Sequence, residues 1–203
     1  HPPRYILDTT TGEPDETAAL AERLSRRGAY FLDATISGSS RQIRGRKGLF
    51  MIGGDPKAFA ACEDLIRDVT GDYEYLGPSG SGSRAKLASN FILGLKRLVL
   101  AEGLAFAERM GLDPGRFLAV VKRSPAYSAA MDSKGGKMIR RDFPPEAKVS
   151  QHYKDLLLIL DKVKDPERFL PLTTVHRRVL EDLMRRGRGD CDNSAVVEYF
   201  RSE

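Results

Sequence analysis

One segment of the chain places a lysine and an amide on the same face of a predicted helix. Lys86 and Asn90 are four residues apart, so their side chains lie one turn from each other. A lysine at a helix start faces the positive end of the helix dipole, and partial burial would further favour its neutral form. Such a lysine suits general acid–base chemistry, and Asn90 could bind a substrate hydroxyl beside it. Gly80 and Gly82 would let the backbone and a ligand approach closely. The alternative, which this pattern alone favours, is a flexible linker followed by an exposed lysine.

Two polar segments follow predicted strands and could bind an anionic group. Residues 33–40 place the hydroxyls of Ser37 and Ser39 beside backbone amides around Gly38, a suitable nest for a carboxylate or phosphate. Residues 8–11 also end a strand, at the position where open α/β sheets bind ligands. The alternatives are a solvent-exposed loop for the first segment and a helix cap at Thr11 for the second.

Charged residues elsewhere give weaker signals. Lys154 and Asp155 precede a run of leucines on a predicted helix, and taken alone they are an exposed charge pair that contributes little. Residues 41–47 are the one basic run dense enough to suggest attraction of an anion. We predict no metal site, because His152 and His176 are isolated and neither cysteine has a partner at ligand spacing.

The elements expected to position these residues change character along the chain. Residues 1–77 alternate strand and helix signals, which is typical of an α/β domain. Residues 78–84 are rich in glycine and serine and predict a linker. One helical pattern then covers residues 86–110, which at 1.5 Å per residue would reach about 37 Å. The expected strands are 4–7, 29–32, 48–52 and 73–76, and the expected helices are one from residue 14 that stops at Gly28, then 57–69, 86–110, 114–122, 128–138, 150–162, 172–186 and 194–200.

The composition excludes several classes of protein. The 203 residues carry 33 Lys and Arg against 28 Asp and Glu, a net charge of +5, and 41% of them are hydrophobic, as in globular proteins. Two distant cysteines exclude a disulfide framework and favour a reducing compartment, so we expect a cytoplasmic protein. No apolar stretch is long enough to span a bilayer, and the chain opens without a signal peptide. It also opens without a methionine, which indicates a fragment or a processed chain.

Five short motifs and a closing segment follow one another in a specific order. They are Asp8-Thr-Thr-Thr, Phe31-Leu-Asp-Ala-Thr-Ile-Ser37-Gly38, Met51-Ile-Gly53-Gly54, Gly80-x-Gly82-x-x-x-Lys86-x-x-x-Asn90, Lys154-Asp155-Leu156 and Gly189-Asp-Cys-Asp-Asn-Ser-Ala. This succession resembles the β-hydroxyacid dehydrogenase family, which includes 3-hydroxyisobutyrate dehydrogenase and tartronate semialdehyde reductase and is related to 6-phosphogluconate dehydrogenase. The resemblance covers essentially the whole chain.

The resemblance implies an α/β fold followed by an all-α fold. Residues 1–77 would be the C-terminal part of an NAD(P)-binding Rossmann-type domain, and residues 78–84 a linker. Residues 85–203 would form a helical domain like that of 6-phosphogluconate dehydrogenase, used for dimerisation and substrate binding. Family members are usually homodimers or homotetramers, so the expected partners are a second copy and a small hydroxy-acid or semialdehyde substrate, with no membrane.

The resemblance also implies roles for single residues. Lys86 matches the catalytic lysine, which takes the substrate's hydroxyl proton during oxidation and returns it during reduction. Asn90 matches the asparagine that holds the substrate beside that lysine. The implied substrate contacts are Ser37, Gly38 and Ser39, and the implied contacts to NAD or NADP are Thr10, Thr11 and Lys154.

Two departures from the family pattern shape the functional prediction. The substrate loop usually reads Ser-Gly-Gly, whereas its third position here is Ser39, and no Gly-x-Gly-x-x-Gly follows a strand anywhere in the sequence. We therefore expect the C-terminal two thirds of an NAD(P)-dependent oxidoreductase, inactive by itself. The alternative is a non-catalytic relative whose basic run 41–47 binds an anionic partner such as nucleic acid. The retention of Lys86, Asn90 and Lys154 argues against that alternative, since a binding module needs none of them.

Overall fold

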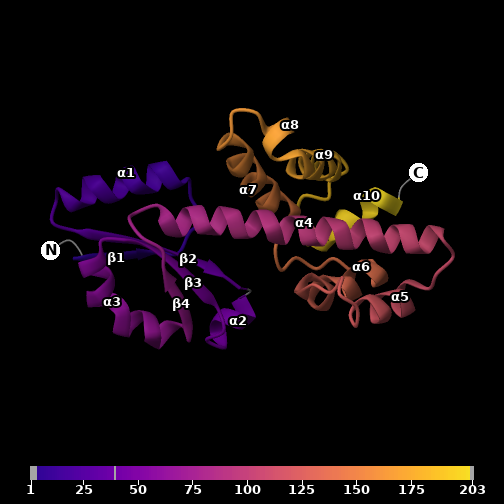
Figure 1. The fold of residues 1–203 in the computed structure, drawn as a ribbon, viewed down its shortest axis with the longest axis horizontal. Coiled ribbons are helices and arrows are strands. Elements are labelled where there is room, and N and C mark those ends of the chain that lie inside the picture. The colour runs from indigo at the N-terminus through magenta and orange to yellow at the C-terminus, as the bar shows by residue number, and fades with distance from the viewer. Residues whose placement is uncertain (1–3, 39, 202–203) are drawn as a thin grey trace. The chain divides into compact units, whose positions relative to one another are not determined.

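The structure is a computed structural model that describes residues 4–38 and 40–201. The chain divides into two compact units, His1–Ser89 and Asn90–Glu203. The long helix α4 (Ser81–Arg109) begins in the first unit and ends in the second (Figure 1). Among the described residues, no helix combines the length and apolar character needed to cross a membrane.

The first unit is built on a four-stranded sheet with the strand order β1-β2-β3-β4. Strands β1 and β2 are parallel, β2 and β3 antiparallel, and β3 and β4 parallel. The carboxyl ends of β1 and β2 therefore share one edge with the amino end of β3. The elements are β1 (Tyr5–Asp8), α1 (Pro14–Ser25), β2 (Tyr30–Ser37), α2 (Ser40–Arg44), β3 (Leu49–Gly54), α3 (Pro56–Val69) and β4 (Asp72–Tyr75).

Alternation along β2 and β3 separates an apolar face of the sheet from a polar one. Leu32 and Ile52 are fully buried on the face that packs against α3, where Cys62 and Ile66 complete the core. The intervening residues point to the opposite face, because successive side chains of a strand alternate. Figure 1 shows α1 and α3 on opposite sides of the sheet. The polar face is thus free to receive the start of α4.

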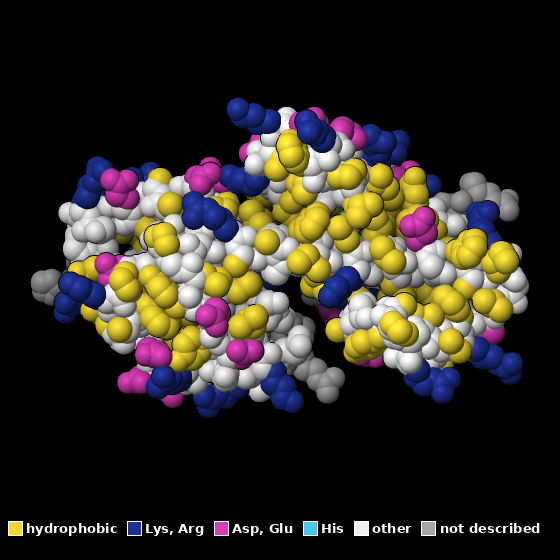
Figure 2. Space-filling view, in the orientation of Figure 1, with side chains coloured by type: hydrophobic (Ala, Val, Ile, Leu, Met, Phe, Trp, Pro, Cys, Tyr) yellow, Lys and Arg dark blue, Asp and Glu magenta, His cyan; other side chains and the backbone are white. Residues whose placement is uncertain are grey.

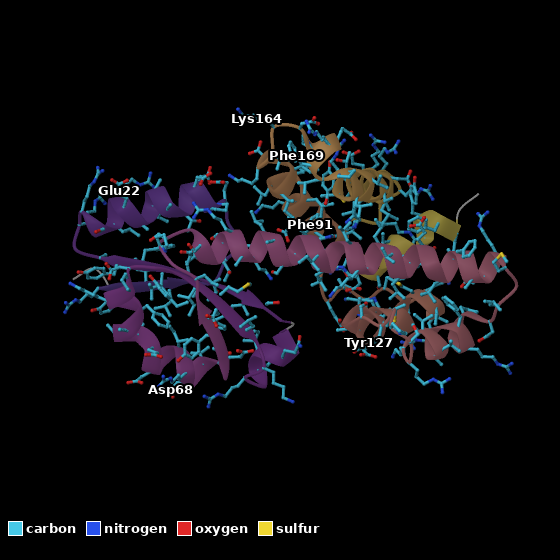
Figure 3. All side chains as sticks on the ribbon, viewed as in Figure 1. Glu22, Asp68, Phe91, Tyr127, Lys164 and Phe169 are labelled. Atoms are coloured by element: carbon cyan, nitrogen blue, oxygen red, sulfur yellow. The ribbon has the colours of Figure 1, made fainter. Side chains whose placement is uncertain are left out.

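The second unit is helical and has a separate core. Apolar side chains of α4, α7 and α9, such as Leu104, Leu156 and Leu183, are fully buried there. Figure 3 labels Tyr127 just after α5, where its hydroxyl donates to Asp132 over 2.6 Å. The elements after α4 are α5 (Pro114–Val121), the π-helical turn η1 (Met131–Gly135), α6 (Gly136–Arg140), α7 (Val149–Asp161), α8 (Pro166–Phe169), α9 (Pro171–Arg185), the 3-10 turn η2 (Asn193–Val196) and α10 (Val197–Arg201).

The buried carboxylate of Asp192 accepts hydrogen bonds from several parts of the helical unit. Asp192 is inaccessible to solvent and accepts hydrogen bonds from Lys134 Nζ at 2.8 and 2.9 Å and from the hydroxyl of Ser194 at 2.7 Å. Burial alone would raise the pKa of Asp192, but the bonds from Lys134 and Ser194 lower it to about 2. Asp192 also accepts from the backbone N–H groups of Glu146 and Ala147, so it ties three parts of the helical unit together.

The predicted order of a sheet-containing part and then helices is confirmed, but some boundaries were wrong. Strand β2 continues to Ser37, so most of the loop expected over 33–40 is strand paired with β3. Helix α4 begins at Ser81 rather than Lys86, and residues 81–84, expected in the linker, form its first turn. The short helices α2 and α8 were not expected, because four or five residues give too little periodicity to detect.

Candidate active site

Side chains of β2 hold the start of α4 against the sheet. Asp33, only 1% exposed, accepts hydrogen bonds from the backbone N–H groups of Gly80 at 2.9 Å and Ser83 at 2.8 Å. The hydroxyl of Thr35 donates to the carbonyl of Gly82 at 2.9 Å. The first N–H groups of a helix have no partner within it, and a carboxylate there also complements the helix dipole. A strand residue 47 positions earlier thus supplies the cap.

The glycines before Lys86 serve this close contact between backbones. A Cβ on Gly82 would lie 2.3 Å from the Asp33 carbonyl oxygen and 2.4 Å from that of Met51. Gly80 has φ +89°, and a Cβ there would lie 2.7 Å from the Pro14 carbonyl oxygen. Residues 81–84 are therefore helical and packed on the sheet, in place of the linker expected there. The glycines were expected to let a ligand approach the backbone. At Gly82 the missing side chain instead lets the start of α4 pack against the sheet.

Lys86 and Asn90 lie one turn apart on α4, about 6 Å along its axis. Both side chains are half-buried. Lys86 lies in the second turn rather than at the helix start, so the dipole argument is weaker than expected, because that effect falls off within the first turn. Asn90 Nδ2 donates to Asp155 Oδ2 over 2.8 Å, which sets the orientation of the amide.

The predicted substrate loop begins where β2 ends. Ser37 is the last residue of β2, pairs with Leu49 and is half-buried. Gly38 is exposed with φ +148°, a conformation that side chains disfavour, and it turns the chain out of the sheet. Ser39, the third residue of this group, lies outside the described residues. Of the expected loop 33–40, Gly38 is therefore the first residue beyond the strand.

The predicted cofactor contacts after β1 form a local turn. The backbone N–H and the hydroxyl of Thr10 both donate to Asp8 Oδ1, at 3.0 and 2.7 Å. Thr11 is half-buried, and the cap that it was expected to provide for α1 comes from Glu13 instead. Because Asp8 and Asp33 are paired in parallel register, this turn lies at the same edge of the sheet as the carboxyl end of β2.

Lys154 and Asp155 differ in their surroundings. Lys154 is exposed on α7, as expected. Asp155 is half-buried and accepts the hydrogen bond from Asn90, so its interpretation as one half of an exposed charge pair was wrong. The pattern could not reveal this contact, because the partners are 65 residues apart.

A buried cationic and imidazole cluster was also missed. His152 of α7 and His176 of α9 pack with ring centroids 5.0 Å apart against Gly94 of α4, where a Cβ would lie 2.3 Å from His152 Nε2. Arg97, one turn further on α4, is 7% exposed. Burial lowers the pKa of Arg97 to about 10 despite the nearby carboxylate of Asp192. Burial, then Arg97, lowers the pKa of His176 to about 3, and the pKa of His152 falls well below 6.5 for the same reasons.

A cleft of the first unit lies away from these residues. About 570 Å³ is enclosed between α1, the start of β2 and the segment before α4. Its lining includes Glu22, labelled in Figure 3, and Tyr30, the first residue of β2. Ser37 is at the other end of that strand, roughly 23 Å away. Thr10, Ser37 and Lys86 are not among the residues that line this cleft. Within the described part of the chain, no three His, Cys, Asp or Glu side chains are grouped to hold a metal ion.

Comparison with known families covers both parts of the chain. Residues 80–200 match the model for the NAD-binding region of NADP-dependent 3-hydroxyisobutyrate dehydrogenase. The chain belongs to this family. Residues 1–77 match the NAD binding domain of 6-phosphogluconate dehydrogenase. The resemblance found in the motifs is therefore confirmed, and the chain is a relative of NAD(P)-dependent oxidoreductases.

Individual relatives of the 3-hydroxyisobutyrate dehydrogenase family have diverse names. The 2-hydroxy-3-oxopropionate reductase of Escherichia coli is 31% identical over 96% of the chain, which covers 67% of that protein. The cytokine-like nuclear factor N-PAC of Aedes aegypti is 29% identical over 97% of the chain, which spans only 35% of that protein. A mitochondrial 3-hydroxyisobutyrate dehydrogenase-like protein of Arabidopsis thaliana is 29% identical over 95% of the chain, which covers 57% of it.

Solved structures support the same fold. A 3-hydroxyisobutyrate dehydrogenase from Salmonella typhimurium matches 96% of the chain with a TM-score of 0.89 and 23% identity, and 68% of that protein is covered. The Mycobacterium tuberculosis enzyme, solved with L-serine, matches with a TM-score of 0.87 and 22% identity. The predicted fold class, an α/β part followed by a helical part of this type, is confirmed.

The family binds NAD(P), but the Gly80–Ser83 turn does not supply a cradle for the pyrophosphate of that cofactor. Such a cradle needs free N–H groups of a glycine-rich turn at a helix start. In the Gly80–Ser83 turn, the N–H groups of Gly80 and Ser83 are bonded to Asp33, and Gly82 packs on the sheet.

Proposed function

We propose that this chain supplies the substrate-binding and proton-transfer residues of an NAD(P)-dependent oxidoreductase that acts on a small β-hydroxy acid or its semialdehyde. The observation that carries the proposal is the rigid mounting of Lys86 and Asn90 on α4. The helix start is capped by a buried carboxylate of the sheet, and Asn90 is oriented by Asp155. Positioning of this kind is what acid–base catalysis requires.

Each residue then has a chemical task. The cofactor, when bound, exchanges a hydride with the substrate carbon. Lys86 Nζ takes the hydroxyl proton during oxidation and returns it during reduction. Asn90 uses Nδ2 for Asp155, so its Oδ1 accepts a hydrogen bond from the substrate hydroxyl. These two residues therefore act on the same oxygen atom of the substrate.

The remaining contacts hold the two ligands in place. We assign the substrate carboxylate to the hydroxyl and amides at the end of β2, because backbone N–H groups that leave a strand suit an anion. We assign the cofactor to the turn after β1 and to the exposed ammonium group of α7. The residues in these roles are Ser37, Gly38 and Ser39 for the substrate, and Thr10, Thr11 and Lys154 for NAD or NADP. We keep residues 1–77 as the cofactor domain and residues 85–203 as the helical domain.

The proposal is tested in the enzyme that contains this chain. We expect Lys86→Met to lower kcat by about 10²- to 10⁴-fold, the contribution of a general acid–base group. Lys96→Met is the matched control, because Lys96 is an exposed lysine of the same helix. Near-normal turnover of the Lys86 variant would exclude the assigned role. The purified 203-residue chain should show no turnover, since its sequence contains no Gly-x-Gly-x-x-Gly motif to bind the pyrophosphate.

We also propose that a second copy covers one face of α4. Ile92, Val99 and Phe106 are seven residues apart and more than half exposed, and Gly103 on the same face leaves open space beside them. Seven residues are nearly two helical turns, so these side chains form one apolar stripe. Figure 2 shows apolar side chains gathered on the visible face of the helical unit. Burying such a stripe against its own copy removes it from water in both chains at once.

A non-catalytic role remains the second candidate. Relatives named as nuclear factor N-PAC match nearly the whole chain, and the basic residues Arg44, Arg46 and Lys47 are exposed. A steep decrease in DNA affinity with salt concentration, lost when these three residues are replaced by Gln, would favour this role. Weak binding that does not depend on them would exclude it.

A further inference from the structure

A small pocket of the helical unit is walled by four arginines. It encloses about 120 Å³, and its lining contains none of the residues given a role in the proposed function. Arg186 and Arg188 follow α9, Arg141 follows α6, and Arg201 is the last residue of α10. The lining residues are Arg141, Leu183, Arg186, Arg188, Glu198 and Arg201.

Two of these guanidinium groups are fixed by protein partners. Arg201 binds Glu108 through Nε at 2.7 Å and through a second nitrogen, and its Nη1 donates to the Met138 carbonyl at 2.7 Å. Arg141 forms a two-pronged pair with Glu198, at 3.0 and 2.6 Å. Such forked pairs are the most rigid arrangement of this side chain. These two arginines thus form a preformed wall of the pocket.

The other two arginines keep more of their donors available. Arg186 Nε lies 2.6 Å from Asp182 Oδ2, an ion pair that does not engage its two terminal nitrogens. Arg188 lies 4.0 Å from Glu198, beyond hydrogen-bond distance. Their side chains are 44% and 43% exposed, so a ligand from solvent can reach them.

The charge of the pocket favours an anion. Four cationic groups and one carboxylate line it, a net charge of +3. Asp182 and Glu108, which hold Arg186 and Arg201 from outside the lining, reduce this to +1. The carboxylates therefore orient the guanidinium groups without cancelling their positive charge.

Arg141 adopts a left-handed conformation with φ 54°, which is uncommon for a residue with a Cβ, and its side chain pairs with Glu198.

We propose that this four-arginine pocket binds a tetrahedral oxyanion, either free phosphate or the phosphoryl group of a small molecule. Guanidinium forks match phosphate oxygens two at a time. A volume of 120 Å³ corresponds to about four water molecules in the liquid, which suits one phosphoryl group and not a nucleotide. Arg186 and Arg188 would donate to the anion, and Arg141 and Arg201 would supply fixed positive charge behind it.

Isothermal titration calorimetry on the 203-residue chain, at constant ionic strength, tests the proposal. We expect inorganic phosphate to bind with one site and a Kd of about 1 mM or lower, and chloride not to compete. Glycerol 3-phosphate is the second arm: tighter binding than phosphate identifies a small-molecule phosphoryl group, and equal or weaker binding identifies free phosphate.

Two variants locate the site. The double variant Arg186→Gln, Arg188→Gln should weaken phosphate binding at least tenfold, with an unchanged far-ultraviolet circular dichroism spectrum. Arg178→Gln is the matched control, since Arg178 is an exposed arginine of α9 paired with Glu167, and it should bind as the parent does. Should the double variant misfold, Arg188→Lys, which keeps the charge and loses the fork, must still weaken binding. Undetectable phosphate binding by the parent, or an equal loss in the control, overturns the proposal.

Discussion

The buried histidine pair of the helical unit should make folding stability depend on pH. His152 and His176 stay neutral in the folded chain, because burial and the nearby charge of Arg97 oppose a second cation. The folded pKa of His176 is about 3, below its ordinary value of 6.5. The unfolded chain therefore binds more protons below pH 6.5, and stability is lost as the pH falls from 6.5 toward 3.

The size of the effect follows from the pKa of His176. At about pH 5 an unfolded histidine is 1.5 units below its pKa, which at about 1.4 kcal/mol per unit costs the folded state about 2 kcal/mol. Burial lowers the pKa of His152 in the same direction, so His152 adds to the loss of stability between pH 7 and pH 5. Arg97, which acts on both histidines, and Asp192, which acts on Arg97, do not contribute in this range. Arg97 has a pKa of about 10 and Asp192 a pKa of about 2, so both keep their charge from pH 5 to pH 7.

Urea unfolding, followed by far-ultraviolet circular dichroism, measures this dependence. The free energy of unfolding of the parent chain should be lower at pH 5 than at pH 7 by at least the about 2 kcal/mol that His176 contributes. His176→Gln should remove about 2 kcal/mol of the difference, and the double variant with His152→Gln should remove more of it. Equal stability of the parent at both pH values, or the same pH dependence in the double variant, would refute the reasoning.

Three further predictions concern α4: two test how its start is held against the sheet, and one tests its exposed apolar stripe. Asp33→Asn should lower the free energy of unfolding by about 2–3 kcal/mol in urea titrations, because one backbone N–H loses its acceptor and faces an NH₂ group; an unchanged midpoint would contradict the cap. Gly82→Ala should cost about 3 kcal/mol by overpacking, whereas Gly103→Ala, in open space on the same helix, should be neutral or stabilising by up to about 1 kcal/mol. Equal effects of Gly82→Ala and Gly103→Ala on the free energy of unfolding would contradict the close contact of Gly82 with the sheet. Val99→Glu with Phe106→Glu should reduce the mass measured by light scattering after size exclusion to that of a monomer, and an unchanged mass would exclude this stripe as the interface.

Local sequence patterns predicted most of the elements and failed where the contacts are long-range. The apolar periodicity of 86–110 predicted a helix, but its start was placed five residues late, because the Gly-Ser composition of residues 80–83 disfavours a helix in isolation. Asp33 and Thr35 of β2 stabilise that first turn, and their distance of 47 residues along the chain hides this from any local pattern. Asp155 was misinterpreted for the same reason.

The sequence by itself determined the family, through six segments whose order and residue types are specific, and it determined the change from an α/β part to helices through hydrophobic periodicity. Only the tertiary structure decided what two of the glycines do: Gly82 lies against two carbonyl oxygens of the sheet, and Gly94 makes room for two imidazole rings. It alone brought the arginines of α6, α9 and α10 around one pocket. Periodicity depends on neighbours within one helix or strand, whereas burial, capping across elements and clusters of charge depend on which elements pack together.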